Sequence, residues 1–239
     1  MSENEFFSGS PKTMFFSGFV AGIAVVAVIT SLYLANITFS DTSLLAQAEQ
    51  DQVVDVGTDD PVAEQPNLST VPALNEDDNY LGNKDASVVL IEYSDIQCPF
   101  CFRHHPTMQQ VVEEFGDDVV WVYRHFPLSF HPEAVPSAVA TECAGEQGKF
   151  FDYLDVMVAN QDSLADDFYL ETATSLGLDL TAWQVCVDSG VMEDKIADQM
   201  SAGAAAGVKG TPATFINGQL VSGAVPYETF KTVIELELE

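Results

Sequence analysis

The distribution of apolar and polar positions divides this chain of 239 residues into stretches of different character. Residues 15–39 contain no charged side chain and are long enough to cross a bilayer as one helix, after a short N-terminus over residues 1–14. Residues 40–79 are rich in acidic and amide side chains and in proline, so they are predicted to form an acidic, disordered linker that cannot fold alone. Residues 80–239 are long enough for one domain with a sizeable core.

Within residues 80–239, the hydrophobic pattern predicts a strand–helix–strand unit followed by a helical block. Residues 88–93 form an apolar run of strand length, residues 98–115 a helix, and residues 119–124 a second strand. Two parallel strands joined by a helix form a right-handed crossover. Further helices are predicted over residues 133–146, 149–160, 163–176, 180–189 and 192–203.

The C-terminal pattern predicts a hairpin and a closing helix. Residues 214–216 and 219–221 are short apolar runs separated by Asn217-Gly218, which favours a tight two-residue turn. Residues 227–238 then have a helical pattern. The whole order predicts an α/β sheet with a helical insertion at about 131–207.

The flanking charges of the apolar segment 15–39 predict its orientation. Lys12 is the only basic residue before it, and none follows until Lys84, so the N-terminus is expected in the cytoplasm and the rest of the chain outside. Ala46-Gln47-Ala48 resembles a cleavage site but lies well past the apolar run, so a retained single-pass anchor is favoured over a cleaved signal. The outer side of a membrane is also where disulfides persist.

Cys98-Pro99-Phe100-Cys101 is the motif that carries chemistry. It lies between the predicted strand at 88–93 and a helix, and a Cys-x-x-Cys at a strand-to-helix turn is typical of thioredoxin-like redox sites. A helix N-terminus favours an anion, so Cys98 is predicted to be the nucleophilic thiolate. Cys101, one turn further into the helix, is predicted to be more buried and to resolve the mixed disulfide.

A metal site is the alternative reading of this motif. Cys101 and His105 are one helical turn apart, and His104 lies beside them. Zinc usually takes four protein ligands, and this segment offers two cysteines and at most one suitably placed histidine. We therefore expect no metal, and expect both histidines to be solvated or to pack against the helix.

Pro212 stands at the entrance to the predicted strand 214–216. A trans proline there removes a hydrogen-bond donor from the sheet. A cis Thr211–Pro212 bond would explain the residue, because native cis prolines occur in tight turns, often functional ones. The residues alone leave both isomers open.

These features together resemble the DsbA-type thiol–disulfide oxidoreductases, a thioredoxin-like family of bacterial envelopes and archaeal surfaces. The resemblance covers about residues 85–238 and four ordered blocks, which is far more specific than a lone Cys-x-x-Cys. The blocks are residues 91–101, 123–128, 143–151 and 207–215.

The resemblance implies a site without cofactors. Cys98 and Cys101 would be the redox pair, and Thr211 and a cis Pro212 would lie against them and pair with the backbone of the substrate. Pro99 and Phe100 would also face substrate. The Pro-Phe dipeptide departs from the Pro-His of the best-known oxidant of the family, and a phenylalanine side chain cannot hydrogen-bond the Cys98 thiolate.

Two carboxylates precede the motif. Glu92 is expected beneath the active site, where burial would raise its pKa and let it exchange a proton with Cys101. The alternative is a hydrated carboxylate at the end of a strand. Asp95 is nearer to Cys98 and is expected to be exposed.

Cys143 and Cys186 form a second pair, within the predicted helical insertion. In an oxidising compartment such a pair often forms a structural disulfide. The alternative is two reduced cysteines that pack as small apolar residues. Among the aromatic residues, Phe100, Phe126 and Phe130 are predicted to form an apolar surface around Cys98.

The charge of the chain limits its partners. It has 37 acidic and 8 basic residues, a net charge of −29, so a basic surface for nucleic acid is excluded. We predict a membrane-anchored oxidase that acts on reduced or unfolded exported polypeptides, with reoxidation by a quinone-linked membrane partner as the resemblance implies. An isomerase or reductase of the same fold is the alternative, followed by a tethered metallochaperone or binding module.

Overall fold

The computed structural model describes residues 71–239, so the predicted anchor at 15–39 and most of the predicted linker lie outside the described residues. Among the described residues, no helix combines the length and the apolar character needed to cross a membrane. The strands are β1 (Asn79–Gly82), β2 (Val88–Ser94), β3 (Val119–His125), β4 (Ala213–Ile216) and β5 (Gln219–Ser222). The α-helices are α2 (Pro99–Phe115), α3 (Ala134–Gly145), α4 (Phe150–Ala159), α5 (Asp166–Ser175), α6 (Leu180–Ser189), α7 (Val191–Ala205) and α8 (Tyr227–Glu237).

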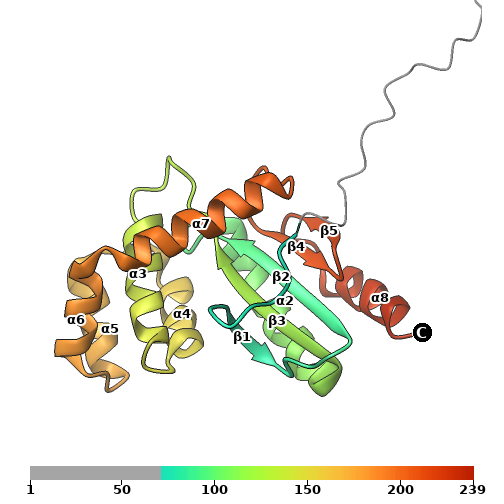
Figure 1. Ribbon diagram of the computed structural model, residues 1–239, viewed down its shortest axis with the longest axis horizontal. Coiled ribbons are helices and arrows are strands. Elements are labelled where there is room, and N and C mark those ends of the chain that lie inside the picture. Colours follow the sequence, from blue (N-terminus) through green and yellow to red (C-terminus); the bar gives the residue numbers. More distant parts are fainter. Residues whose placement is uncertain (1–70) are drawn as a thin grey trace, which may run out of the picture. The chain divides into compact units, whose positions relative to one another are not determined.

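The five strands form one mixed sheet in the order β1-β3-β2-β4-β5. The central strands β2 and β3 are parallel and joined by α2, whereas every other neighbouring pair is antiparallel. Helices α3 to α7 are inserted between β3 and β4, and Figure 1 shows α3 to α6 gathered to one side of the sheet while α7 leads back across it. The predicted fold class, an α/β sheet with a helical insertion, is therefore confirmed.

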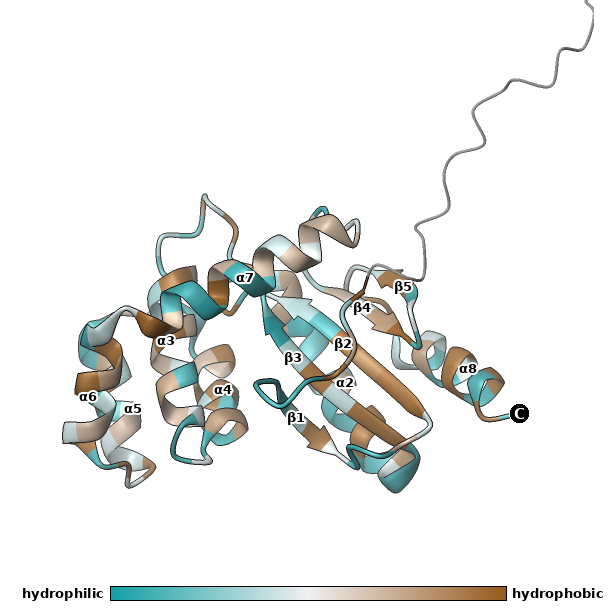
Figure 2. Cartoon of the chain, in the orientation of Figure 1, coloured by the Kyte–Doolittle hydropathy of each residue, from teal (hydrophilic) through white to brown (hydrophobic). Residues whose placement is uncertain are grey.

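Alternation along β2 and β3 assigns their side chains to two cores. Leu90 of β2 and Trp121 of β3 face the larger core, which also contains α2, α8 and the insertion. Ile91 and Val122 face the opposite side of the sheet. Because both faces are covered, both central strands read as nearly continuous apolar runs, and β2 is the long brown strand of Figure 2.

The second face of the sheet is covered by the end of α7 and by the segment that precedes β1. Val71 and Leu74 pack against this face, beside Ala206 just after α7. Gly203 of α7 allows a close approach, since a Cβ atom there would lie 2.7 Å from the ring of Tyr93. The contacts of the chain with the sheet therefore begin several residues before the boundary predicted at residue 80.

The β4–β5 hairpin has the predicted turn. Asn217 and Gly218 both have positive φ angles, of 46° and 89°, which suits a tight turn between antiparallel strands. Ile216 pairs with Gln219 across it. The hairpin fixes β4 beside β2, and the residues just before β4 therefore lie at the end of the sheet where α2 begins.

Candidate active site

Cys98 lies at the N-terminus of α2, immediately after the loop that leaves β2. It is the N-cap residue, with an extended backbone, and Pro99 is the first residue of the helix. Proline suits this position because a first-turn amide has no partner within the helix. The chain therefore leaves the strand, turns, and begins the helix directly at Cys98.

The surroundings of Cys98 favour its thiolate. A hydrogen bond from Cys101 lowers the pKa of Cys98 most; burial opposes this, and the side chain of Thr211 and the amides of Phe100 and Cys101 lower it further. The resulting pKa is about 5, against an ordinary value of 9.0. Cys98 is thus ionised at neutral pH and able to act as a nucleophile or a leaving group.

Cys101 behaves in the opposite way. Burial raises the pKa of its thiol well above 9.0, and the hydrogen bond and negative charge of Cys98 raise it further. The side chain of Ser94 and the backbone of Asp95 oppose this rise, and the Asp95 amide lies 3.5 Å from the Cys101 sulfur. Both cysteines are buried and neither is in a disulfide. Because their pKa values are shifted in opposite directions, Cys101 keeps its proton while Cys98 carries the negative charge.

Thr211 and Pro212 approach Cys98 from the end of β4. The Thr211–Pro212 peptide bond is cis, as the resemblance implied. The Cys98 sulfur lies 3.6 Å from the carbonyl oxygen of Thr211. The hydroxyl oxygen of Thr211 is buried and has no hydrogen-bond partner of its own.

Glu92 is fully buried on β2, facing α2. Its Oε2 accepts a hydrogen bond of 2.9 Å from Nε1 of Trp121 and lies 3.9 Å from Nε2 of His104. His104 is also fully buried, and burial lowers its pKa although Glu92 opposes the shift, so its ring is neutral at neutral pH. The alternative of a hydrated carboxylate at the strand end is wrong for Glu92.

Asp95 is buried rather than exposed, contrary to the expectation from sequence, with 2% of its surface accessible. Oδ1 accepts a hydrogen bond from the Gln97 amide, and Oδ2 accepts one from the Leu128 amide and lies 2.7 Å from Nδ1 of His131. These last two partners come from the loop between β3 and α3, more than thirty positions further along the chain. No local pattern could have indicated them.

Two glutamines tie the active-site loop to the helical insertion, and sequence reasoning did not find either. Oε1 of Gln97 accepts a hydrogen bond from the Glu133 amide. Nε2 of Gln161 donates to the carbonyl oxygens of Ile96 and Cys98. The insertion therefore holds the backbone that presents the nucleophile.

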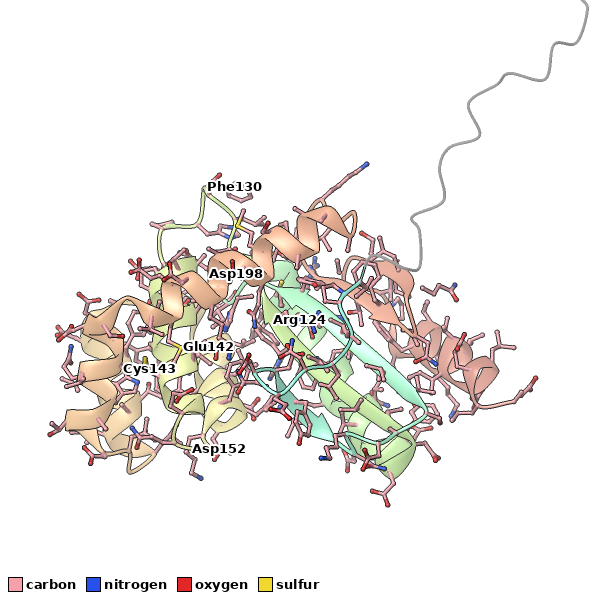
Figure 3. All side chains as sticks on the ribbon, viewed as in Figure 1. Arg124, Phe130, Glu142, Cys143, Asp152 and Asp198 are labelled. Atoms are coloured by element: carbon pink, nitrogen blue, oxygen red, sulfur yellow. A yellow bond between two sulfur atoms is a disulfide. The ribbon has the colours of Figure 1, made fainter. Side chains whose placement is uncertain are left out.

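The aromatic residues near the site divide into exposed and buried ones. Phe100 is 52% exposed and Phe130 is 73% exposed, and Figure 3 shows Phe130 at the tip of its loop. Phe126, which was expected on the same apolar surface, is buried, and its ring packs edge-on against Tyr93. The guanidinium of Arg103 lies 4.5 Å from the centre of the Phe100 ring.

The other residues singled out from the sequence make structural contacts outside the Cys98–Cys101 pair. Cys143 and Cys186 form a disulfide that joins α3 to α6. Nε2 of His105 lies 2.6 Å from Asp155 on α4. Among residues 71–239, no group of three or more histidine, cysteine, aspartate or glutamate side chains is arranged to hold a metal ion.

Comparison with protein families gives one match of most of the described region. Residues 74–236 match the model described as thioredoxin. Among curated relatives, a protein named Na(+)/H(+) antiporter NhaA 1 from Mycobacterium sp. (strain KMS) is 34% identical over 169 residues, which are 70% of this chain and 27% of that protein. One from Herminiimonas arsenicoxydans is 30% identical over 72% of this chain and 28% of its own length. The chain thus spans well under a third of these relatives.

Solved structures share the fold at low sequence identity. The thiol-disulfide exchange protein alpha-DsbA2 from Wolbachia pipientis has a TM-score of 0.62 and 19% identity, over 68% of this chain and 87% of that one. Oxidised BdbD from Bacillus subtilis has a TM-score of 0.61 and 20% identity, over 73% of this chain and 96% of that one.

Proposed function

The chain belongs to the thioredoxin family, and from this premise we propose that it is a thiol–disulfide oxidoreductase that introduces disulfide bonds into exported proteins. The observation that carries the proposal is the opposite shift of the two cysteine pKa values, to about 5 for Cys98 and well above 9.0 for Cys101. A dithiol with one stable thiolate and one stable thiol is a stable reduced state. This is the state that the enzyme reaches after it has oxidised a substrate.

The proposed reaction starts from the Cys98–Cys101 disulfide. A substrate thiolate attacks the Cys98 sulfur, the bond between the two cysteines breaks, and Cys101 leaves as a thiolate that takes up a proton. A second substrate thiolate then attacks the substrate sulfur of the mixed disulfide, and Cys98 leaves as a thiolate. The substrate loses two electrons and gains a disulfide, while the enzyme becomes the dithiol.

The low pKa of Cys98 favours this direction. A thiol of lower pKa leaves faster, and stabilising the thiolate stabilises the reduced enzyme, which makes the disulfide more oxidising. The Cys98 thiolate has no partner in the Phe100 side chain, so its stabilisation comes from Cys101, Thr211 and backbone amides.

The surroundings of Cys98 suit an unfolded polypeptide. The Thr211 and Pro212 backbone would pair with an extended substrate, and Pro99 and the exposed Phe100 would contact its apolar side chains. In this proposal the apolar segment 15–39 tethers the domain to the outer side of the cell membrane. A quinone-linked membrane protein would reoxidise the Cys98–Cys101 pair.

The first test is the reduction potential of the Cys98–Cys101 pair, measured on the full-length chain in detergent by equilibration in glutathione buffers. We expect a value above about −180 mV, the value of protein disulfide isomerase. A value near the −270 mV of thioredoxin, to within about 20 mV, would contradict the oxidase and favour a reductase or isomerase.

Single-cysteine variants test the assigned roles. Cys98→Ala should lose the ability to oxidise a reduced model protein, because the attacked sulfur is gone. Reduced Cys101→Ala, treated with oxidised glutathione, should instead accumulate a stable mixed disulfide at Cys98. A Cys98→Ala chain that retains oxidase activity would contradict the proposal.

A further inference from the structure

The helical insertion contains a groove with apolar side chains, between α3, α5 and α6. Its volume is about 380 Å³. Among the residues that line it, Val139 and Trp183 are buried, whereas Val135 and Leu170 are 40% and 43% exposed. Figure 1 shows α5 and α6 at the end of the molecule opposite α8. Large apolar side chains that stay half exposed in a hollow are typical of a surface that contacts another molecule.

The helices that form this groove are joined to one another. The Cys143–Cys186 disulfide joins α3 to α6. Nε1 of Trp183, on α6, donates a hydrogen bond of 3.1 Å to the carbonyl oxygen of Ala140, on α3. The groove is therefore formed before a partner binds, and binding does not have to order the helices.

The charges around the groove are all negative. Four exposed carboxylates line it, and no basic side chain of the described residues does. The only basic residues of α3 to α7 are Lys149 and Lys195, and both form ion pairs outside the groove. A cation would offset the negative potential at the groove. The four carboxylates are those of Asp166, Asp167, Asp188 and Glu193.

The stability of the helices does not account for all of these charges. Asp166 and Asp167 lie in the first turn of α5, where the helix dipole favours a negative charge. Asp188 is the second-last residue of α6, where the dipole opposes a negative charge. A positively charged partner would give Asp188 a favourable contact that its own helix does not supply.

Two hydrogen bonds connect the groove to the loop that carries Cys98. Tyr169, which lines the groove, donates its hydroxyl to Oε2 of Glu133 at 2.8 Å. The Glu133 amide donates to Oε1 of Gln97, the residue before Cys98. A polypeptide whose cysteine reacts at Cys98 can therefore reach the groove with a neighbouring segment.

We propose that this groove binds a segment of the substrate polypeptide in which an apolar side chain is flanked by lysine or arginine residues. This inference rests on the proposed function, because it takes the polypeptide that is oxidised at Cys98 to be the occupant. The apolar side chain contacts Val135 and Leu170. The basic side chains face the carboxylates of Asp166 and Asp188.

Charge complementarity disfavours the other occupants. Residues 40–79 of the same chain carry many carboxylates and no basic residue, so the groove repels them. A second copy of the chain has a net charge of −29 and is repelled as well. An anionic lipid surface meets the same repulsion.

The first test is the binding of a fluorescent, cysteine-free peptide to the full-length chain in detergent, measured by anisotropy at low salt. The peptide has leucines flanked by lysines, and a second peptide has glutamates in place of the lysines. We expect the lysine peptide to bind at least about tenfold more tightly, and the difference to shrink as added salt screens the charges. Equal Kd values for the two peptides would overturn the proposal.

Neutralising the carboxylates tests the location of the site. The double variant Asp166→Asn, Asp188→Asn keeps the shapes of both side chains and should raise the Kd of the lysine peptide about fivefold, as for the loss of exposed ion pairs. The control variant Glu113→Gln, Asp117→Asn removes the same charge from exposed positions at the end of α2 and just after it. It should keep the wild-type Kd. Equal shifts in both variants would mean that net charge alone attracts the peptide, which would overturn the site.

A second pair of variants tests the apolar contact independently of charge. Leu170→Ser should raise the Kd of the lysine peptide about tenfold, as for the truncation of a central contact residue. Val185→Ser is the matched control, because Val185 is 67% exposed on α6 but does not line the groove. Binding that Leu170→Ser leaves unchanged would contradict the groove as the site.

A reduced peptide that joins one cysteine to the lysine segment through a flexible linker of about ten residues tests the identity of the occupant. The oxidised wild-type chain should oxidise this peptide with a second-order rate constant about fivefold above that of Asp166→Asn, Asp188→Asn, while both chains oxidise uncharged dithiothreitol at one rate. Equal rates with the peptide would refute the proposal. A chain that binds the cysteine-free peptide but oxidises neither thiol would instead remove the proposed function, and with it the substrate as the occupant.

Discussion

Cys98 and Cys101 are the same residue type one helical turn apart, yet the fold moves their pKa values in opposite directions. Cys98 lies at the helix N-terminus and receives a hydrogen bond from its neighbour, whereas burial governs Cys101. A lowered pKa stabilises the folded, reduced protein. For Cys98 this stabilisation is complete above the ordinary pKa of 9.0 and is lost as pH falls through about 5.

Thr211 gives a direct test at this scale. Its buried hydroxyl has no hydrogen-bond partner in the structure and is free to donate to the Cys98 thiolate, and its side chain lowers the pKa of Cys98. Thr211→Val should raise that pKa by about one to two units, which corresponds to the loss of a hydrogen bond to a charged group. The measurement is a titration of thiolate ultraviolet absorbance in the reduced protein.

Thr172→Val is the control for this titration, because the Thr172 hydroxyl donates to the Phe168 carbonyl within α5. Its titration should keep the midpoint of about 5. A Thr211→Val midpoint that also stays near this value would show that the threonine does not stabilise the Cys98 thiolate.

Residues whose role follows from a short sequence motif could be predicted from sequence. Residues whose role depends on partners far along the chain could not. Cys98 and Pro212 stand in short motifs beside a strand, so their positions were clear from the chain. Asp95 was expected to be exposed because its partner His131 is remote in sequence, and Gln161 lies in no recognisable motif.

At the scale of elements, the segment before β1 is fixed to the sheet by Arg124 of β3. The guanidinium binds both carboxylate oxygens of Asp78, at 2.9 and 2.7 Å, and donates to the carbonyls of Pro72 and Ala73 and to the Tyr93 hydroxyl. Figure 3 shows Arg124 between this segment and the strands. One buried cation thus satisfies acceptors on both sides of the contact.

Arg124→Lys should destabilise the protein by about 3 kcal/mol, because a lysine cannot form this planar, two-pronged contact and leaves buried acceptors unpaired. Urea unfolding measures the change in the free energy of unfolding. Lys231→Gln is the control, because it removes an exposed ion pair with Glu114 that solvent screens. Equal effects of the two substitutions would contradict the role given to Arg124.

Sequence predicted the helices better than the first strand. The helix at 180–189 has the predicted limits, but the helix expected from residue 163 begins at Asp166, because Gln161–Ser163 forms a short 3-10 turn. The strand β1 was not predicted at all. Its four residues include Asn79 and Gly82, which have little strand propensity, and antiparallel pairing with β3 holds them in place.

At the scale of the whole molecule, a buried cluster of charges connects the sheet to the insertion. Glu142 of α3 lies 3.3 Å from His125 of β3 and 2.8 Å from Lys195 of α7, and it accepts a hydrogen bond from Asn79 of β1. Figure 3 shows Glu142 on α3, one residue before Cys143. Because this carboxylate of α3 contacts three other elements, its ionisation bears on how the insertion is held against the sheet.

Glu142→Gln should therefore produce a loss of stability that depends on pH. Burial raises the pKa of Glu142, but His125 and Lys195 outweigh it, so the net shift is downward from 4.5. A lowered carboxyl pKa contributes stability that is present above 4.5 and is lost as pH falls through the folded value. We expect a deficit of about 3 kcal/mol at neutral pH, as for a broken buried pair.

Urea unfolding of the wild type and of Glu142→Gln across a pH series tests this sign. The two free energies of unfolding should converge only as pH falls through the lowered pKa of folded Glu142, because the wild-type carboxylate is then protonated and resembles the amide. Glu113→Gln, on an exposed face of α2, should follow the wild type at every pH. A Glu142→Gln deficit that stays constant from neutral to acid pH would mean that the shape of the side chain, and not its charge, joins the insertion to the sheet.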